Sequence, residues 1–235
     1  MDDGKEPAPY VHPIQTRQQD AWKRLLSDYL TVEPLEVGFA QRLRAEHVEL
    51  FLELGGGRGP ISHLLAADDI RCVLLDLNVR DWEGHHRPAV IGDLRAIPTR
   101  RDSFDAVAAV NCLYFLPDPV AAIHEAYEIL KPGGLFLAST PSRYHDPELA
   151  GIPSLHRGTR GTFDAEEAPD LVAQVFDDIE VNWWEVAAYH LPDQAAVVDY
   201  LLAFGVVDPE AHAADLPVPL DITKTGVDVW ARRPS

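Results

Sequence analysis

One stretch of the chain places an acid and three glycines at every second position: Glu53, Gly55, Gly57 and Gly59. A second acid, Asp76, closes an apolar run further along. Glycines where a strand turns into a helix let the backbone pass close to a ligand without a side chain in the way. A carboxylate at the end of the next strand can accept hydrogen bonds from the two hydroxyls of a ribose. The pattern predicts a site for a nucleoside-containing ligand.

Two common nucleotide-binding patterns do not fit this stretch. A G-x-G-x-x-G fingerprint would need its third glycine at Pro60 or at Ser62, and no G-x-x-x-x-G-K-S/T sequence is present. The pattern E-x-G-x-G-x-G instead resembles the first motif of the class I S-adenosylmethionine-dependent methyltransferases.

Further segments resemble the same family in the same order. Residues 73–76 resemble its second strand with the ribose-binding acid, and residues 91–98 its third strand with an adenine-contacting acid. Residues 104–118 and 129–137 resemble the fourth strand with its helix and the fifth strand. The resemblance implies a Rossmann-like α/β fold, a doubly wound seven-stranded mostly parallel sheet with an antiparallel last strand, preceded by a helical cover.

The resemblance also implies the cofactor, S-adenosyl-L-methionine, and a role for each motif residue. The glycines would line the methionine and ribose, Asp76 would hold the ribose hydroxyls and Asp93 would contact the adenine amino group. Leu77 and Leu94 would sandwich the adenine, and Asn111 would lie near the sulfonium. The expected cofactor-binding residues are Glu53, Gly55, Gly56, Gly57, Gly59, Asp76, Leu77, Asp93, Leu94, Asn111 and Cys112. Glu53 could instead hold the glycine turn in place.

The order of apolar patterns predicts one domain with added cover elements. Helical patterns begin at Thr16, are interrupted by Pro34 and resume with Val37, Ala40 and Leu43 on one face. We expect a helical cover over residues 1–45 and a methyltransferase domain over 46–235, with substrate-side insertions at 141–162 and 190–220. Later strands are expected at 104–111, 135–140, 179–188 and 223–232, and later helices at 117–130, 165–176 and 193–204.

Composition limits the partners. The net charge of −18 disfavours a nucleic-acid substrate and an anionic membrane surface, because such proteins carry basic faces. The acidity can also serve solubility alone. Two cysteines form no disulfide framework, no signal peptide or membrane span is evident, and no third ligand accompanies His85 and His86. We therefore expect a cytoplasmic protein without a metal, as a monomer or a homodimer.

The acceptor side is less determined. Residues 141–162 leave the carboxyl end of a predicted strand and carry a local basic cluster, which suits an acidic acceptor, a mobile lid or a merely solvated loop. The residues expected to contact the substrate are Tyr114, Arg143, Tyr144 and His145. The weak candidates for a general base are His145, His156 and His190, and the sequence does not decide among them.

These observations predict transfer of a methyl group from S-adenosylmethionine to the oxygen or nitrogen of a small molecule, a metabolite or natural-product intermediate. Two alternatives remain at this point. One is a methyltransferase-like protein that binds the cofactor without turnover, and the other is a NAD-dependent oxidoreductase, disfavoured by Pro60.

Overall fold

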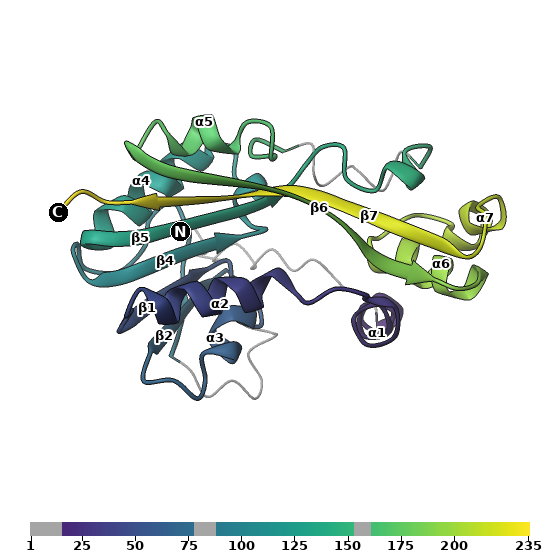
Figure 1. The fold of residues 1–235 in the computed structure, drawn as a ribbon, viewed down its shortest axis with the longest axis horizontal. Coiled ribbons are helices and arrows are strands. Elements are labelled where there is room, and N and C mark those ends of the chain that lie inside the picture. Colours follow the sequence, from purple (N-terminus) through teal and green to yellow (C-terminus); the bar gives the residue numbers. More distant parts are fainter. Residues whose placement is uncertain (1–15, 78–87, 153–160) are drawn as a thin grey trace, which may run out of the picture.

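The computed structural model describes residues 16–77, 88–152 and 161–235. A seven-stranded sheet forms its centre, with the strand order β3-β2-β1-β4-β5-β7-β6 (Figure 1). The strands are β1 (Leu50–Leu54), β2 (Arg71–Asp76), β3 (Ala89–Ile91), β4 (Phe104–Val110), β5 (Leu130–Pro141), β6 (Asp178–Leu191) and β7 (Leu220–Arg232). Neighbouring strands among the first five, β1 to β5, pair in parallel, and β7 is antiparallel to both β5 and β6. The predicted fold class is confirmed.

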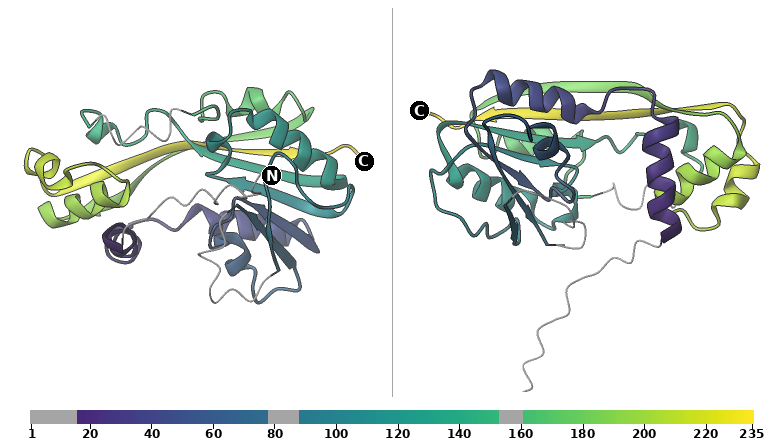
Figure 2. Two further views of the ribbon diagram at one scale, coloured as in Figure 1. Left: turned by 180° about the vertical axis from the view of Figure 1, so that it is seen from behind. Right: turned by 90° about the horizontal axis from the view of Figure 1, so that it is seen from below.

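Helices cover both faces of the sheet (Figures 1 and 2). Helices α2 (Leu35–Ala45) and α3 (Pro60–Leu64) pack on one face, where Phe39 meets Trp230 with ring centroids 6.0 Å apart. Helices α4 (Pro119–Ile129) and α5 (Ala168–Val172) pack on the other face. Apolar runs buried from both sides are the reason that β1 and β4 read as continuous hydrophobic segments.

Strands β6 and β7 continue past the carboxyl end of β5. The pairing of β5 with β7 ends at Pro141 and Gly226, whereas the pairing of β6 with β7 continues to Leu191 and Leu220. Because β6 runs in the same direction as β5, this hairpin projects on the side where the parallel strands end. That edge is where ligands bind in doubly wound sheets.

A second hydrophobic core lies on this projecting hairpin. It is formed with helices α1 (Thr16–Arg24), α6 (Gln194–Ala203) and α7 (Pro209–Ala214) and the π-helical turn η1 (Leu25–Tyr29). Trp22 packs on Phe204 with ring centroids 4.9 Å apart, and Arg24 pairs with Asp199 at 2.5 Å. We call this group of elements the outer lobe.

The observed helices refine the sequence-based expectations. The predicted helix at 193–204 is present as α6, and the Asp193 side chain caps its first turn by accepting a hydrogen bond from the Ala196 amide at 2.9 Å. Helix α7 was not expected. The described part of segment 1–45 packs in two places, with α2 on the sheet and α1 in the outer lobe. The assignment of 1–45 as a cover over the ligand stays a prediction.

The outer lobe supplies a matched pair of stability tests. Leu25 is fully buried in its core, whereas the neighbouring Leu26 is 54% exposed. We expect Leu25→Ala to lower the free energy of unfolding by about 2–5 kcal/mol, because it removes buried methyl groups and leaves a cavity. Leu26→Ala should change it by less than about 0.5 kcal/mol. Urea unfolding followed by circular dichroism measures both, and equal losses would contradict the packing described here.

Candidate cofactor and acceptor site

The glycine-rich turn joins β1 to α3 in a conformation that side chains resist. Gly55, Gly57 and Gly59 have φ values of +57°, +50° and +65°. A Cβ atom on Gly55 would lie 2.5 Å from Cys112 Cβ, and one on Gly59 would lie 2.7 Å from Leu74 Cδ2. A Cβ on Gly57 would meet nothing within 4 Å. Packing therefore demands glycine at 55 and 59, while Gly57 borders open space that a ligand can occupy.

Glu53, on β1, stabilises the turn through hydrogen bonds from the start of α3. Its carboxylate is buried and accepts hydrogen bonds from the Ile61 amide at 3.2 Å, the Ser62 amide at 2.9 Å and the Ser62 hydroxyl at 2.6 Å. Burial raises the pKa of Glu53, although these bonds oppose the shift. The side chain thus fastens the first turn of α3 to β1. This geometry matches the alternative role considered for Glu53, that of supporting the turn.

Asp76 brings the second strand to the same place. Its Oδ2 accepts a hydrogen bond from the Gly57 amide at 2.9 Å, and the Gly55 amide donates to the Leu75 carbonyl at 2.7 Å. The carboxyl ends of β1 and β2 are thereby joined through the glycine turn. A carboxylate beside this turn is placed as a ribose-binding acid must be.

The expected adenine side shows one charged pair and two differently buried leucines. Arg95 donates to Asp93 from its backbone amide at 2.9 Å and from its guanidinium at 2.6–3.1 Å. The Arg95 side-chain bonds hold the pKa of Asp93 below its ordinary value, so the carboxylate is charged. Leu77 is 61% exposed, whereas Leu94 is buried in the main core. The sandwich of adenine between them stays a prediction.

The end of β4 contributes Asn111 and Cys112. Asn111 is exposed, has a φ of +52° and donates its amide to the Ser139 carbonyl at 2.9 Å. A left-handed conformation in a residue other than glycine is uncommon and turns the chain sharply here. The buried Cys112 thiol lies 3.4 Å from the Leu54 carbonyl oxygen. Burial, with smaller effects from Asp76 and Glu53, raises the pKa of Cys112.

A polar group next to this turn was missed by sequence reasoning. Asp228 is 9% exposed, and its Oδ1 accepts hydrogen bonds from the Ser139 hydroxyl at 2.7 Å and from the Trp184 indole at 3.1 Å. Burial raises the pKa of Asp228. The pairing of β5 with β7 sets Ser139 opposite Asp228, and the pairing of β7 with β6 adds Trp184. No local pattern in the sequence signals this meeting of three strands.

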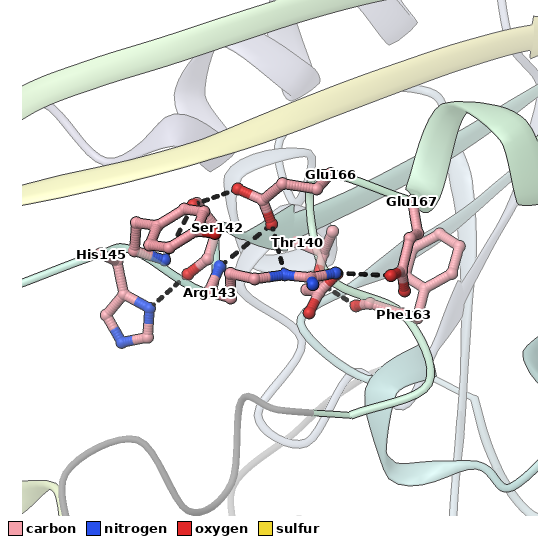
Figure 3. A network of polar contacts seen from close by, with 9 residues as sticks. Thr140, Ser142, Arg143, His145, Phe163, Glu166 and Glu167 are labelled. Atoms are coloured by element: carbon pink, nitrogen blue, oxygen red, sulfur yellow. Dashed lines mark hydrogen bonds and ion pairs between the residues drawn. The ribbon is translucent and has the colours of Figure 1, made fainter. Parts of the chain in front are cut away.

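The expected basic cluster is neutralised where the structure describes it. Figure 3 shows the Arg143 guanidinium among carboxylates. It lies 2.7 Å from Asp164, 2.6 Å from Glu167 and 3.3 Å from Glu166. The hydrogen bonds that Arg143 donates to Asp164, the largest cause, and to Glu167 raise its pKa. One cation among three carboxylates leaves this region negative, so Arg143 is poorly placed to attract an acidic acceptor.

The base candidates differ in accessibility. His145 is 4% exposed, with Nδ1 2.6 Å from the Ser142 carbonyl oxygen and Nε2 3.4 Å from Asp146 Oδ2. Burial lowers the pKa of His145, which favours its neutral form. His190 lies on the projecting hairpin, exposed, with Nδ1 2.6 Å from Asp221. His156, like His85 and His86, lies outside the described residues.

The two tyrosines expected at the acceptor side are placed differently. Tyr114 follows Cys112 and is half-buried against the main core, and burial raises the pKa of its hydroxyl. Tyr144 is 71% exposed on the segment after β5. Neither placement tests the expected substrate contact, which stays a prediction.

A buried ion pair fastens the segment after β5 to the outer lobe. Lys224 Nζ lies 2.6–2.8 Å from the Asp146 carboxylate, and Asp146 is fully buried. The same ammonium lies 4.2 Å from the ring centroid of Phe204 and 5.1 Å from that of Tyr200. Burial lowers the pKa of Lys224, while Asp146 counteracts the shift. Truncating one partner of such a pair leaves the other charge buried and uncompensated.

The comparison with known proteins agrees with this arrangement. A family described as a methyltransferase domain matches residues 52–138, the segment from β1 to β5 that carries the glycine turn, Asp76, Asp93 and Asn111. This segment of the chain is therefore similar to the methyltransferase domain that its sequence motifs resemble.

Relatives and structural neighbours extend the likeness. The chain is 26% identical to a ubiquinone biosynthesis O-methyltransferase of Hydrogenovibrio crunogenus over 152 residues, which cover 60% of this chain and 58% of that enzyme. It is 25% identical to a trans-aconitate 2-methyltransferase of Methylobacterium radiotolerans over an alignment of 240 residues, which covers 86% of this chain and 84% of that enzyme. The chain spans little more than half the length of the curated relatives that it matches first, 58% and 55%. The cyclase SpnF shares the fold, with a TM-score of 0.62 and 19% identity over 94% and 96% of the chains.

Two absences apply to the described ranges. Among residues 16–77, 88–152 and 161–235, no three His, Cys, Asp or Glu side chains are grouped to hold a metal ion. None of the helices in the described part of the chain has the length and apolar character needed to cross a bilayer.

The two cysteines of the matched segment give a direct test of the turn. Cys72 and Cys112 are both buried, and the raised pKa of Cys112 disfavours its thiolate. At about pH 8.5, where an ordinary thiol is half ionised, iodoacetamide should modify neither cysteine in the native protein. Mass spectrometry should find both modified once guanidinium unfolds the chain. Rapid labelling of Cys112 in the native protein would contradict its packing against Gly55.

Proposed function

We propose that the protein transfers the methyl group of S-adenosylmethionine to a nitrogen or oxygen atom of a small-molecule acceptor. The observation that carries the proposal is the Gly57 amide donating to the Asp76 carboxylate, beside the open space over Gly57. It joins the two motifs that family resemblance assigns to the methionine–ribose part of the cofactor. The two named relatives act, by their names, on small molecules, which supports an acceptor of this class.

The residues fit S-adenosylmethionine in detail. Asp76 can accept from ribose hydroxyls, and Asp93 could accept from the adenine amino group in exchange for one of its four hydrogen bonds from Arg95. Gly57 keeps a side chain out of the ligand's path, while Gly55 and Gly59 hold the turn against β4 and β2. The backbone amide of Asn111 donates to the Ser139 carbonyl on β5. This bond keeps Asn111 at the edge where the sulfonium would lie.

The chain's part in the chemistry is chiefly positioning. The bound sulfonium supplies an activated methyl group, so an acceptor lone pair forms the new bond as the carbon–sulfur bond breaks and a thioether leaves. Holding the acceptor in line with that bond replaces an encounter in solution, an advantage of roughly 7–11 kcal/mol in favourable cases. A proton on the acceptor leaves to water or to a nearby base. His145, neutral but nearly buried, remains a weak candidate for that base.

We favour a neutral or amine acceptor over a carboxylate. The expected acid-binding cation, Arg143, is matched by Asp164, Glu166 and Glu167. Beside the end of β5 lies Asp228, a further acid. The trans-aconitate relative argues for a carboxylate, so an acceptor screen must hold both classes. The same proposal includes a cytoplasmic location, a monomeric or homodimeric state and no nucleic-acid substrate. The net charge of −18 supports the exclusion of nucleic acid, and the presence of only two cysteines in the sequence supports a reducing compartment.

A second candidate function is cofactor binding without methyl transfer. The specific observation is the fold shared with SpnF, which is named a cyclase. Fold alone does not settle the reaction class.

Titration calorimetry with S-adenosylhomocysteine tests the cofactor site. Asp76→Ala should weaken binding by about ten- to a hundredfold, because it removes charge-assisted hydrogen bonds to the ribose. Asp69→Ala is the matched control, since Asp69 is exposed at the opposite end of β2. It should leave the affinity within about twofold. Tight binding of NAD in place of S-adenosylhomocysteine would refute the proposal.

Methyl transfer itself is tested with donor labelled in the methyl group. We expect label to appear in a small molecule from a panel of amines, phenols and carboxylic acids. Asp76→Ala should abolish that transfer at low donor concentration, and Asp69→Ala should not. Labelling of purified RNA or protein instead would contradict the acceptor class. Binding of S-adenosylhomocysteine with no acceptor labelled would favour the second candidate function.

A further inference from the structure

An open hollow lies over the projecting hairpin, away from the glycine turn. Its volume is about 550 Å³, within the usual range of small-molecule sites. The segment after β5 forms one wall, and strands β6 and β7 form the base. The lining residues are Ser142, Tyr144, Pro147, Glu166, Trp183, Trp184, Glu185, Thr223, Thr225 and Gly226. None of them belongs to the cofactor motifs.

Two large aromatic side chains line this hollow and remain uncovered. Trp183 is 59% exposed and Tyr144 is 71% exposed. Trp183 packs on no other aromatic ring in the described part of the chain, although large aromatics usually bury most of their surface. Exposed aromatic surface gathered in a concavity commonly marks a binding site.

The charged groups at the hollow are all acidic. Glu166 and Glu185 line it, and no lysine, arginine or histidine does so among the lining residues. Glu185 is exposed and forms no ion pair with a described residue. Burial alone would raise the pKa of Glu166, but hydrogen bonds from Ser142 and from the Arg143 amide outweigh it, so the pKa is lowered and the carboxylate stays charged. Glu166 is paired with Arg143 at 3.3 Å, so the negative charge that no described cation offsets is that of Glu185.

Strand alternation removes the nearest cation from the hollow. Thr223 and Thr225 face it, whereas Lys224, between them, points to the opposite side of β7 and is buried against Asp146 and aromatic rings. Arg143 is similarly occupied by its three carboxylates (Figure 3). Both of these described cations are already paired.

Hydrogen bonds fix the hollow's walls in place. The Ser142 hydroxyl donates to Glu166, and the Ser142 amide donates to the Thr225 carbonyl at 2.9 Å. Trp184 is fixed by its bond to Asp228 and by its ring, which covers Gly226 so closely that a Cβ there would lie 2.2 Å away. A site built on strands and paired loops holds its shape without a ligand.

We infer that this hollow binds an alkylated ammonium group, with Trp183 and Tyr144 against its methyl groups and Glu185, which pairs with no described cation, matching its charge. An aromatic face attracts a cation through its quadrupole, and a nearby carboxylate adds Coulomb attraction. An anion would be repelled, and a neutral apolar ligand would gain nothing from the carboxylates. The inference concerns residues outside the cofactor motifs and does not rest on the proposed methyl transfer.

Choline chloride is the probe for this site. Titration calorimetry, paired with quenching of the exposed Trp183, should show saturable binding with a Kd below about 10 mM, as expected for one small cation in an open site. The carbon isostere of choline, in which a tert-butyl group replaces trimethylammonium, should bind at least about fivefold more weakly. Raising the ionic strength should weaken choline binding, because the carboxylates are exposed to salt.

Matched variants locate the binding. Trp183→Leu and Glu185→Gln should each weaken choline binding by about two- to fivefold, and their combination by more. Phe115→Leu and Glu49→Gln are the controls, since the first also replaces an exposed aromatic ring by leucine and the second makes the same Glu-to-Gln change, both outside the hollow. All four positions are exposed, so the variants should keep the stability of the parent protein.

Clear outcomes overturn the inference. It fails if choline and its carbon isostere bind equally, if no saturable binding occurs up to about 50 mM, or if the hollow variants behave as their controls do. Asp76→Ala separates the two proposals, because it should weaken S-adenosylhomocysteine binding by about ten- to a hundredfold and leave choline binding intact. Loss of choline binding in Asp76→Ala would place the cation at the cofactor site and contradict the inference.

Discussion

The close approach of two glycines, Gly55 and Gly59, to neighbouring strands sets the geometry on which the cofactor side depends. Gly55 leaves no room for a Cβ beside Cys112, and Gly59 leaves none beside Leu74. Since the turn touches the end of β4 on one side and β2 on the other, the positions of Asn111 and Asp76 follow from it. Glu53 then fixes the direction in which α3 leaves the turn. A side chain at 55 or 59 would move every one of these groups.

The edge of the sheet at which the parallel strands end borders two parts of the molecule, the strand ends themselves and the outer lobe. On the sheet, the strand ends carry the cofactor motifs, and beyond them the outer lobe stands on β6 and β7 (Figure 2). The buried pair of Lys224 with Asp146 connects the lobe to the segment after β5. A charged pair buried among aromatic rings tolerates little displacement, because separating it would leave each charge desolvated. The lobe and the segment are thus held to a single relative position.

Three cations near the two proposed sites form ion pairs within the structure. Arg95 is paired with Asp93, Arg143 with Asp164 and its neighbours, and Lys224 with Asp146. What remains at the described surfaces of the segment after β5 and the hairpin is carboxylate, beside exposed aromatic rings. An acidic net charge of −18 is therefore more than a solubility device in this region, since it decides the sign of the ligands that the hollow can hold.

The cofactor side could be read from the sequence because its residues lie close together along the chain and in fixed order. The turn at 55–59 and the acid at 76 are separated by one short helix and one strand, so local pattern determined the strand ends and the sheet class. Ser139, Trp184 and Asp228 could not be read in this way, because each lies in an ordinary strand pattern and they meet only when β5, β7 and β6 pair. The charge of Arg143 looked available in the sequence, and folding placed Asp164, Glu166 and Glu167 around it. The sequence determined the glycine turn and the acid beside it, because these form locally, whereas long-range strand pairing decided which side chains meet at the end of β5 and which charges stay unpaired.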